Sequence, residues 1–142
     1  MRILLCCLFS LSILSGRAQS IAAFSVPKDA VSQLEDVKET TKLVADTKLG
    51  KAKAQAEARP EINRLLVISA DDFLRITTAE KPTKEAYLQC LDRNLARLYP
   101  LTTNVQDRRQ VADFFQELME IVGLPSSEGR LMTFAASPVT KQ

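Results

Sequence analysis

The ionisable and nucleophilic side chains of this chain limit the chemistry that it can perform. None of its 142 residues is histidine. Without imidazole, Ser–His–acid and Cys–His nucleophilic sites are excluded, as are the commonest ligands of zinc. Of three cysteines, only Cys90 lies outside an amino-terminal segment that we expect to be removed. One thiolate cannot form a metal site within one chain, so we expect no metal, no cofactor and no enzymatic activity.

Carboxylates are the remaining candidates for catalysis. Asp113, Glu117 and Glu120 follow one another at spacings of four and three, which places them along one side of a predicted helix. Two acids can hydrolyse glycosides when they face each other across a cleft. These three lie opposite the apolar side of their own helix, where a solvated stripe is the ordinary arrangement. We therefore expect no catalysis from them.

Polar side chains near this helix could instead bind a ligand. The hydroxyls of Ser126 and Ser127 could face a ligand or cap the segment that follows, and capping requires fewer assumptions. Arg108 lies near the start of the helix, where the dipole disfavours a cation, and Asp107 or an acidic partner could offset that effect. The candidate binding residues are Asp107, Arg108, Glu117, Ser126 and Ser127.

The first 18 residues have the order of a secretory signal peptide. Arg2 precedes an uncharged apolar run over residues 3–14, and the small residues Gly16 and Ala18 precede a predicted cut after Ala18. The run is shorter than the roughly 20 residues that a membrane-spanning helix needs. Arg17 stands where a bacterial lipoprotein site would require cysteine. We expect a periplasmic or secreted product with no lipid anchor and no integral membrane span.

Removal of this segment also changes the charge of the chain. The full sequence has 19 Lys and Arg against 17 Asp and Glu. Arg2 and Arg17 leave with the segment and no acid does, so the product is neutral. A neutral domain has no overall attraction to nucleic acid or anionic lipid, and we expect no nucleic-acid partner.

The remaining sequence indicates an all-α fold, because helix-forming residues predominate and the chain has only four glycines. We expect a lead-in and a long polar helix in residues 19–59, a bundle of three to four helices in 60–135 and a disordered tail in 136–142. The long helix has a narrow apolar stripe and almost nothing to bury after Gly50. It is either partly undocked or forms a coiled coil with a partner.

Within residues 60–135, apolar residues at spacings of three and four predict three helices followed by a short last segment. The first begins at Pro60, and the second follows Thr83. Cys90 lies beside the leucine stripe of the second helix, where we expect an inert buried thiol. The third begins after Asn104, with Asp107 in the acidic position of a capping box, and ends at Gly123.

Four short runs follow one another in the carboxy-terminal half. They are an Asp-Arg pair at 107–108, Glu-Leu-Met at 117–119, Ile-Val-Gly-Leu at 121–124 and Ser-Ser-x-Gly at 126–129. In these runs the chain resembles a small bacterial family of exported helical proteins, domain-of-unknown-function family 4844. The resemblance extends over about residues 60–135 and is weaker before them. It implies an all-helical domain with no established activity, substrate or catalytic residue.

We therefore expect a non-enzymatic module of the bacterial envelope that binds another protein through a helical face. An inhibitor or immunity protein would be a narrower version of this role. The alternative is a small-molecule binder or weak hydrolase, whose pocket would bring Arg108, Glu117 and the Ser126–Ser127 turn together. A purely structural envelope component is a third interpretation. The partner and the oligomeric state do not follow from the residues.

Overall fold

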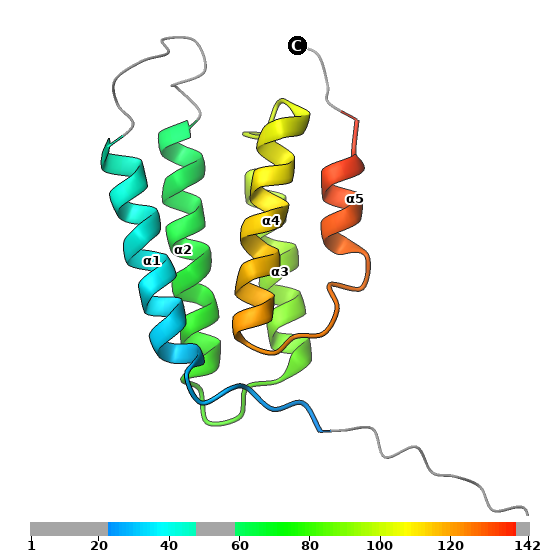
Figure 1. Cartoon of the computed structure of the whole chain (residues 1–142). Helices are drawn as coiled ribbons and strands as arrows, with labels where there is room; N and C mark the ends of the chain where they lie inside the picture. Colours follow the sequence, from blue (N-terminus) through cyan, green and yellow to red (C-terminus); the bar gives the residue numbers. More distant parts are fainter. Residues whose placement is uncertain (1–22, 48–58, 139–142) are drawn as a thin grey trace, which may run out of the picture.

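Five helices and no strand make up the described residues, 23–47 and 59–138, of the computed structural model. They are α1 (Ala30–Thr47), α2 (Arg59–Thr77), α3 (Lys84–Leu98), α4 (Val105–Ile121) and α5 (Arg130–Ala136). In Figure 1, α1 and α2 lie side by side, α4 lies in front of α3, and the short α5 lies beside α4. The all-α prediction is confirmed. In these residues no helix is long and apolar enough to cross a membrane.

The first helix packs on the bundle. It contacts α2 along its length and α4 at only a few positions. Ala30 and Leu34 are fully buried, and Lys38 Nζ lies 3.2 Å from an oxygen of Asp71 on α2. The narrow stripe of residues 30–42 is thus covered by α2, whereas the expectation of a partly undocked helix depends on the residues after Gly50. Residues 48–58 lie outside the described part of the chain.

Three aromatic side chains join the central helices. The ring centroids of Phe73 (α2) and Tyr87 (α3) are 5.4 Å apart, and those of Phe73 and Phe115 (α4) are 6.3 Å apart. All three residues are fully buried. Phe24, in the lead-in before α1, packs edge-on against Tyr87 at 5.8 Å. The core thus fixes the positions of α2, α3 and α4 and also holds the segment that leads into α1.

The ends of α3 and α4 are closed by the local signals that the sequence predicts. Thr83 Oγ1 accepts a hydrogen bond from the Ala86 amide at 3.2 Å, and Asn104 Oδ1 accepts one from the Asp107 amide at 2.8 Å. Gly123 has a φ of 71°, and the next amide, Leu124, donates to the Met119 carbonyl at 2.8 Å. This is a Schellman arrangement, which requires the left-handed conformation that glycine adopts without strain.

The sequence predicts a disordered tail in residues 136–142, but residues 136–138 are held on the bundle. Ala136 is the last residue of α5, and the carbonyls of Ser137 and Pro138 accept hydrogen bonds from Arg108. A helix of seven residues is too short to be stable alone. It is held by the buried side chains of Leu131 and Phe134, in addition to these hydrogen bonds. Residues 139–142 lie outside the described part.

Candidate functional site

Asp107 and Arg108 complete the start of α4. Asp107 Oδ2 accepts a hydrogen bond from Asn104 Nδ2 at 2.6 Å, so a side-chain bond accompanies the cap that Asn104 forms on the Asp107 amide. The Arg108 side chain is buried, with 2% of its surface exposed. Its Nε donates to the Thr102 carbonyl at 3.0 Å, and Nη1 donates to the carbonyls of Ser137 and Pro138. The guanidinium therefore holds backbone segments together and its donors are directed away from solvent.

The Ser126–Ser127 turn makes local hydrogen bonds. Ser126 Oγ accepts from the Glu128 amide at 3.0 Å, and Ser127 Oγ accepts from the Leu131 amide at 3.5 Å. Glu128 and Gly129 both have positive φ, of 53° and 82°. The two hydroxyls thus bond to amides of the same short stretch of chain. The N-cap position of α5 is Gly129, which has no side-chain cap, so the serines support the turn and do not occupy the cap itself.

Glu117 is directed away from Arg108. The two residues are nine positions apart on α4, which is two and a half helical turns, so they lie on opposite sides of the helix. Arg108 is buried and Glu117 is exposed. The five candidate residues therefore do not surround one cavity. The pocket on which the small-molecule alternative depends is not formed by these side chains.

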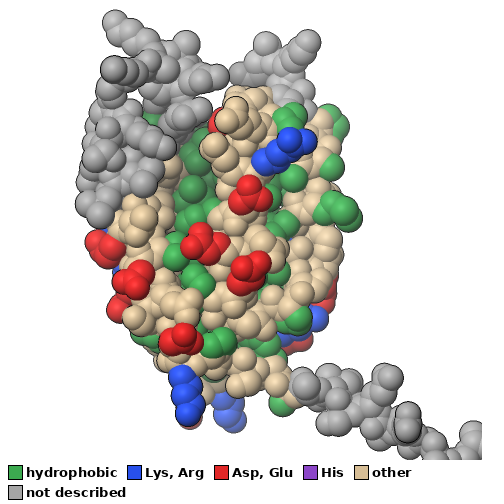
Figure 2. Space-filling model, in the orientation of Figure 1, with side chains coloured by type: hydrophobic (Ala, Val, Ile, Leu, Met, Phe, Trp, Pro, Cys, Tyr) green, Lys and Arg blue, Asp and Glu red, His purple; other side chains and the backbone are tan. Residues whose placement is uncertain are grey.

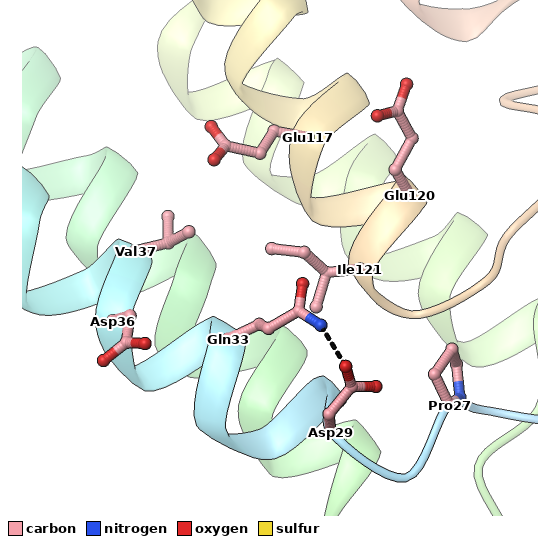
Figure 3. Close-up of a pocket in the computed structure, with 8 residues that line it drawn as sticks. All are labelled: Pro27, Asp29, Gln33, Asp36, Val37, Glu117, Glu120 and Ile121. Carbon is pink, nitrogen blue, oxygen red and sulfur yellow. Dashed lines mark hydrogen bonds between the residues drawn. The ribbon is translucent and has the colours of Figure 1, made fainter.

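A groove between α1 and α4 does contain Glu117. Its volume is about 550 Å³, within the usual range of about 300–1,000 Å³ for ligand pockets. Its two walls are the first turns of α1 and the last turns of α4 (Figure 3). The residues that line it are Pro27, Asp29, Gln33, Asp36, Val37, Glu117, Glu120 and Ile121.

Apolar side chains form the floor of this groove. Figure 3 shows Val37 of α1 and Ile121 of α4 directed into the space between the two helices. Phe114 lies two turns before Ile121 on the same side of α4 and is half-buried. In Figure 2 hydrophobic atoms are visible in a hollow between α1 and α4. The groove stays open because α1 packs mainly on α2, so the two helices that form its walls contact each other only at a few positions.

Carboxylates surround the floor. Asp29 and Asp36 come from α1 and the residues just before it, and Glu117 and Glu120 come from α4. None of the four forms an ion pair with the described residues. Gln33 donates to Asp29 at 2.6 Å and Gln116 to Glu120 at 3.0 Å, and both donors are neutral amides. Among the described residues, no lysine or arginine lines the groove, and acidic side chains predominate on this face in Figure 2. The groove therefore favours a cation.

Sequence reasoning identified only half of this groove. It placed Asp113, Glu117 and Glu120 on a solvated stripe, and all three are exposed. It missed Asp29 and Asp36, which flank Gln33 at spacings of four and three. That acidic spacing resembles the stripe on α4. The acidic spacing is therefore present in both helices, but no local sequence pattern predicts that α1 and α4 face each other across a groove.

The only cysteine of the described residues, Cys90, is fully buried. Burial raises the pKa of its thiol from 9.0 to about 11, and Asn94 Nδ2 lies 3.3 Å from its sulfur. A thiol with so high a pKa is a poor nucleophile at neutral pH. The prediction of a buried thiol is confirmed. The described residues contain no group of three or more Cys, Asp or Glu side chains that could hold a metal ion.

These observations define a small all-α bundle domain with an acidic groove between its first and fourth helices. The chain belongs to the family described as Domain of unknown function (DUF4844), whose model matches residues 25–137. The match begins before α1, so the family unit includes the helix for which the sequence resemblance was weaker. No curated protein and no solved structure matches the chain significantly.

Proposed function

We propose that the chain is a non-enzymatic protein-interaction module that binds its partner in the groove between α1 and α4. The single observation that carries this proposal is the apolar floor surrounded by four carboxylates that have no ion pair in the described residues. Surface carboxylates need no partner, because water solvates them. The apolar floor between them is only partly covered, because Val37 is half-buried and Ile121 is 9% exposed, and a partner would remove this remaining apolar surface from water.

A role in binding is also favoured over catalysis by the chemistry of the remaining groups. The chain has no histidine, and its buried thiol has a raised pKa. The carboxylates of the groove are exposed to solvent. A general acid would need burial or a close like charge to hold its proton at neutral pH. Nothing in the groove supplies a reacting group other than these solvated acids.

The proposed site of action is the bacterial cell envelope or the medium. Support comes from the charged, apolar and small-residue order of residues 1–18. In this setting an inhibitor or immunity protein is the narrower role, since such proteins block their targets by occupying a surface. A toxin or hydrolase encoded beside the chain would be its expected target.

The test is site-specific photocrosslinking in cells that express the chain naturally. A photoreactive residue replaces Gln33 in the groove or, as the matched control, Gln89 on α3, which is also exposed. We expect a discrete crosslinked product from Gln33 and none from Gln89. The purified partner should then lose affinity for the double variant Asp36→Asn/Glu117→Gln and keep it for Glu80→Gln/Glu85→Gln, which removes the same charge elsewhere. Equal crosslinking from both positions would contradict the proposal.

A further inference from the structure

We infer that the occupant of the groove is a cationic amphipathic α-helix of the partner, with apolar residues on one side and Lys or Arg on both flanks. This inference rests on the proposed function, because it names the partner of the same groove. It follows from the shape, the apolar floor and the charge of the groove.

The shape of the groove favours a helix over an extended strand. The described residues contain no sheet, so no strand edge is available to which an extended peptide could add. The walls are two helices, and a third helix packs between two others by placing its ridge of side chains in the groove that they form. From Asp29 to Val37 the α1 wall extends over eight residue steps, or about 12 Å, which corresponds to about two turns of a docked helix.

The floor requires apolar residues on one side of that helix. Val37 and Ile121 are directed into the groove from opposite walls, and Pro27 closes one end of it (Figure 3). Apolar side chains at positions i, i+4 and i+7 of the partner would cover this floor. A small polycation such as a polyamine would leave the floor in contact with water.

The charges of the two groove walls determine which charges the partner helix should have on its two flanks. Asp36 belongs to the α1 wall, and Glu117 and Glu120 belong to the α4 wall. A helix that lies between them has acidic groups on both sides of its apolar stripe. Lys or Arg on only one flank would leave the carboxylates of the other wall unpaired, whereas basic residues on both flanks would match both walls.

The test uses a defined probe, a synthetic 14-residue peptide with leucine at i, i+4 and i+7 and lysine on both flanks, capped at its ends. It is titrated into isotope-labelled protein produced from the full chain, and the amide shifts are mapped by NMR. We expect the shifts to cluster at residues 27–37 and 114–121. Asp36→Asn/Glu117→Gln should weaken binding at least tenfold, and Glu80→Gln/Glu85→Gln should leave it within twofold.

The apolar contribution is tested separately. Val37→Ser should weaken binding of the peptide about fivefold. Val67 is a half-buried valine of α2 outside the groove, and Val67→Ser should leave the affinity unchanged. Circular dichroism of each variant checks the fold, and the charge variants test the groove independently of any packing change. A shuffled peptide of the same composition should bind at least tenfold more weakly.

Several results would overturn the inference and leave the proposed function intact. They are equal binding of the shuffled peptide, equal affinity for spermine at the same residues, and no effect of Val37→Ser on a folded protein. Crosslinking from Gln33 to a second copy of the chain would also overturn it, because the occupant would then be the chain itself. A failure of Gln33 to crosslink any partner contradicts the proposed function and the inference together.

Discussion

The guanidinium carbon of Arg108 lies 4.5 Å from the centroid of the Tyr99 ring, and the Phe134 ring packs on the same tyrosine at 6.3 Å. Tyr99 follows α3, Arg108 lies in the first turn of α4 and Phe134 belongs to α5. One cation–π contact and one aromatic pair thus connect the last three helices. The hydrogen bonds of Arg108 to backbone carbonyls add the residues after α5 to this connection.

Replacement of Arg108 by methionine should lower the free energy of unfolding by about 3 kcal/mol. The change leaves the buried Thr102 carbonyl without its charged donor and removes the cation–π contact, and each loss costs about 1–2 kcal/mol. Urea unfolding measures the total. Amide hydrogen exchange should show that α5 loses protection first. The neighbouring Arg109→Met is the control, since Arg109 is exposed, and a similar loss there would contradict the role of Arg108.

Two glycines with positive φ should differ in their tolerance of alanine. Gly129 has a φ of 82° and no atom near the place of an added Cβ, so Gly129→Ala should cost about 1 kcal/mol from backbone strain alone. At Gly123 the φ is 71° and a Cβ would also lie 3.2 Å from Pro27 Cδ. Gly123→Ala should therefore cost about 2 kcal/mol. The urea midpoints of the two variants measure this difference. A lower midpoint for Gly129→Ala than for Gly123→Ala would show that Pro27 moves aside without destabilising the fold.

Cys90 should make stability fall with rising pH. Burial raises the pKa of the folded thiol from 9.0 to about 11, so the unfolded chain loses its proton first. The stabilisation is complete below pH 9 and is lost between pH 9 and about 11. Urea unfolding at pH 8 and pH 10 should show a larger decrease for the natural chain than for Cys90→Ala. Equal decreases would mean that the thiol has the same pKa in both states.

The amino-terminal segment should be removed on export. Expression of the full chain in a bacterial host should yield a periplasmic product that begins at Gln19, as measured by intact mass. Ala18→Gln should block or displace the cut, because the peptidase requires a small residue there. Ala22→Gln, four residues later, should be processed normally. An unprocessed chain in the cytoplasm would contradict the export proposal.

The candidate site could be predicted only in part from the sequence. Glu117 was identified because the spacing of acids on α4 is visible in one stretch of chain. Its partners in the groove are residues 29–37, about eighty positions earlier, and their proximity depends on how α1 packs on α2. The sequence allows the Ser126–Ser127 turn to be a ligand site or a cap. Its observed hydrogen bonds lie within four residues, so they are local enough to follow from the sequence.

By itself, the sequence determined the helices, their caps at Thr83 and Asn104 and the closing glycine at Gly123. Each of these depends on hydrogen bonds and side-chain spacings within about five residues, where local chemistry decides the conformation. Only the tertiary structure decided the role of Arg108 and the existence of the groove. A buried guanidinium must find acceptors wherever the fold provides carbonyls. The groove exists because α1 packs mainly on α2 and contacts α4 at only a few positions.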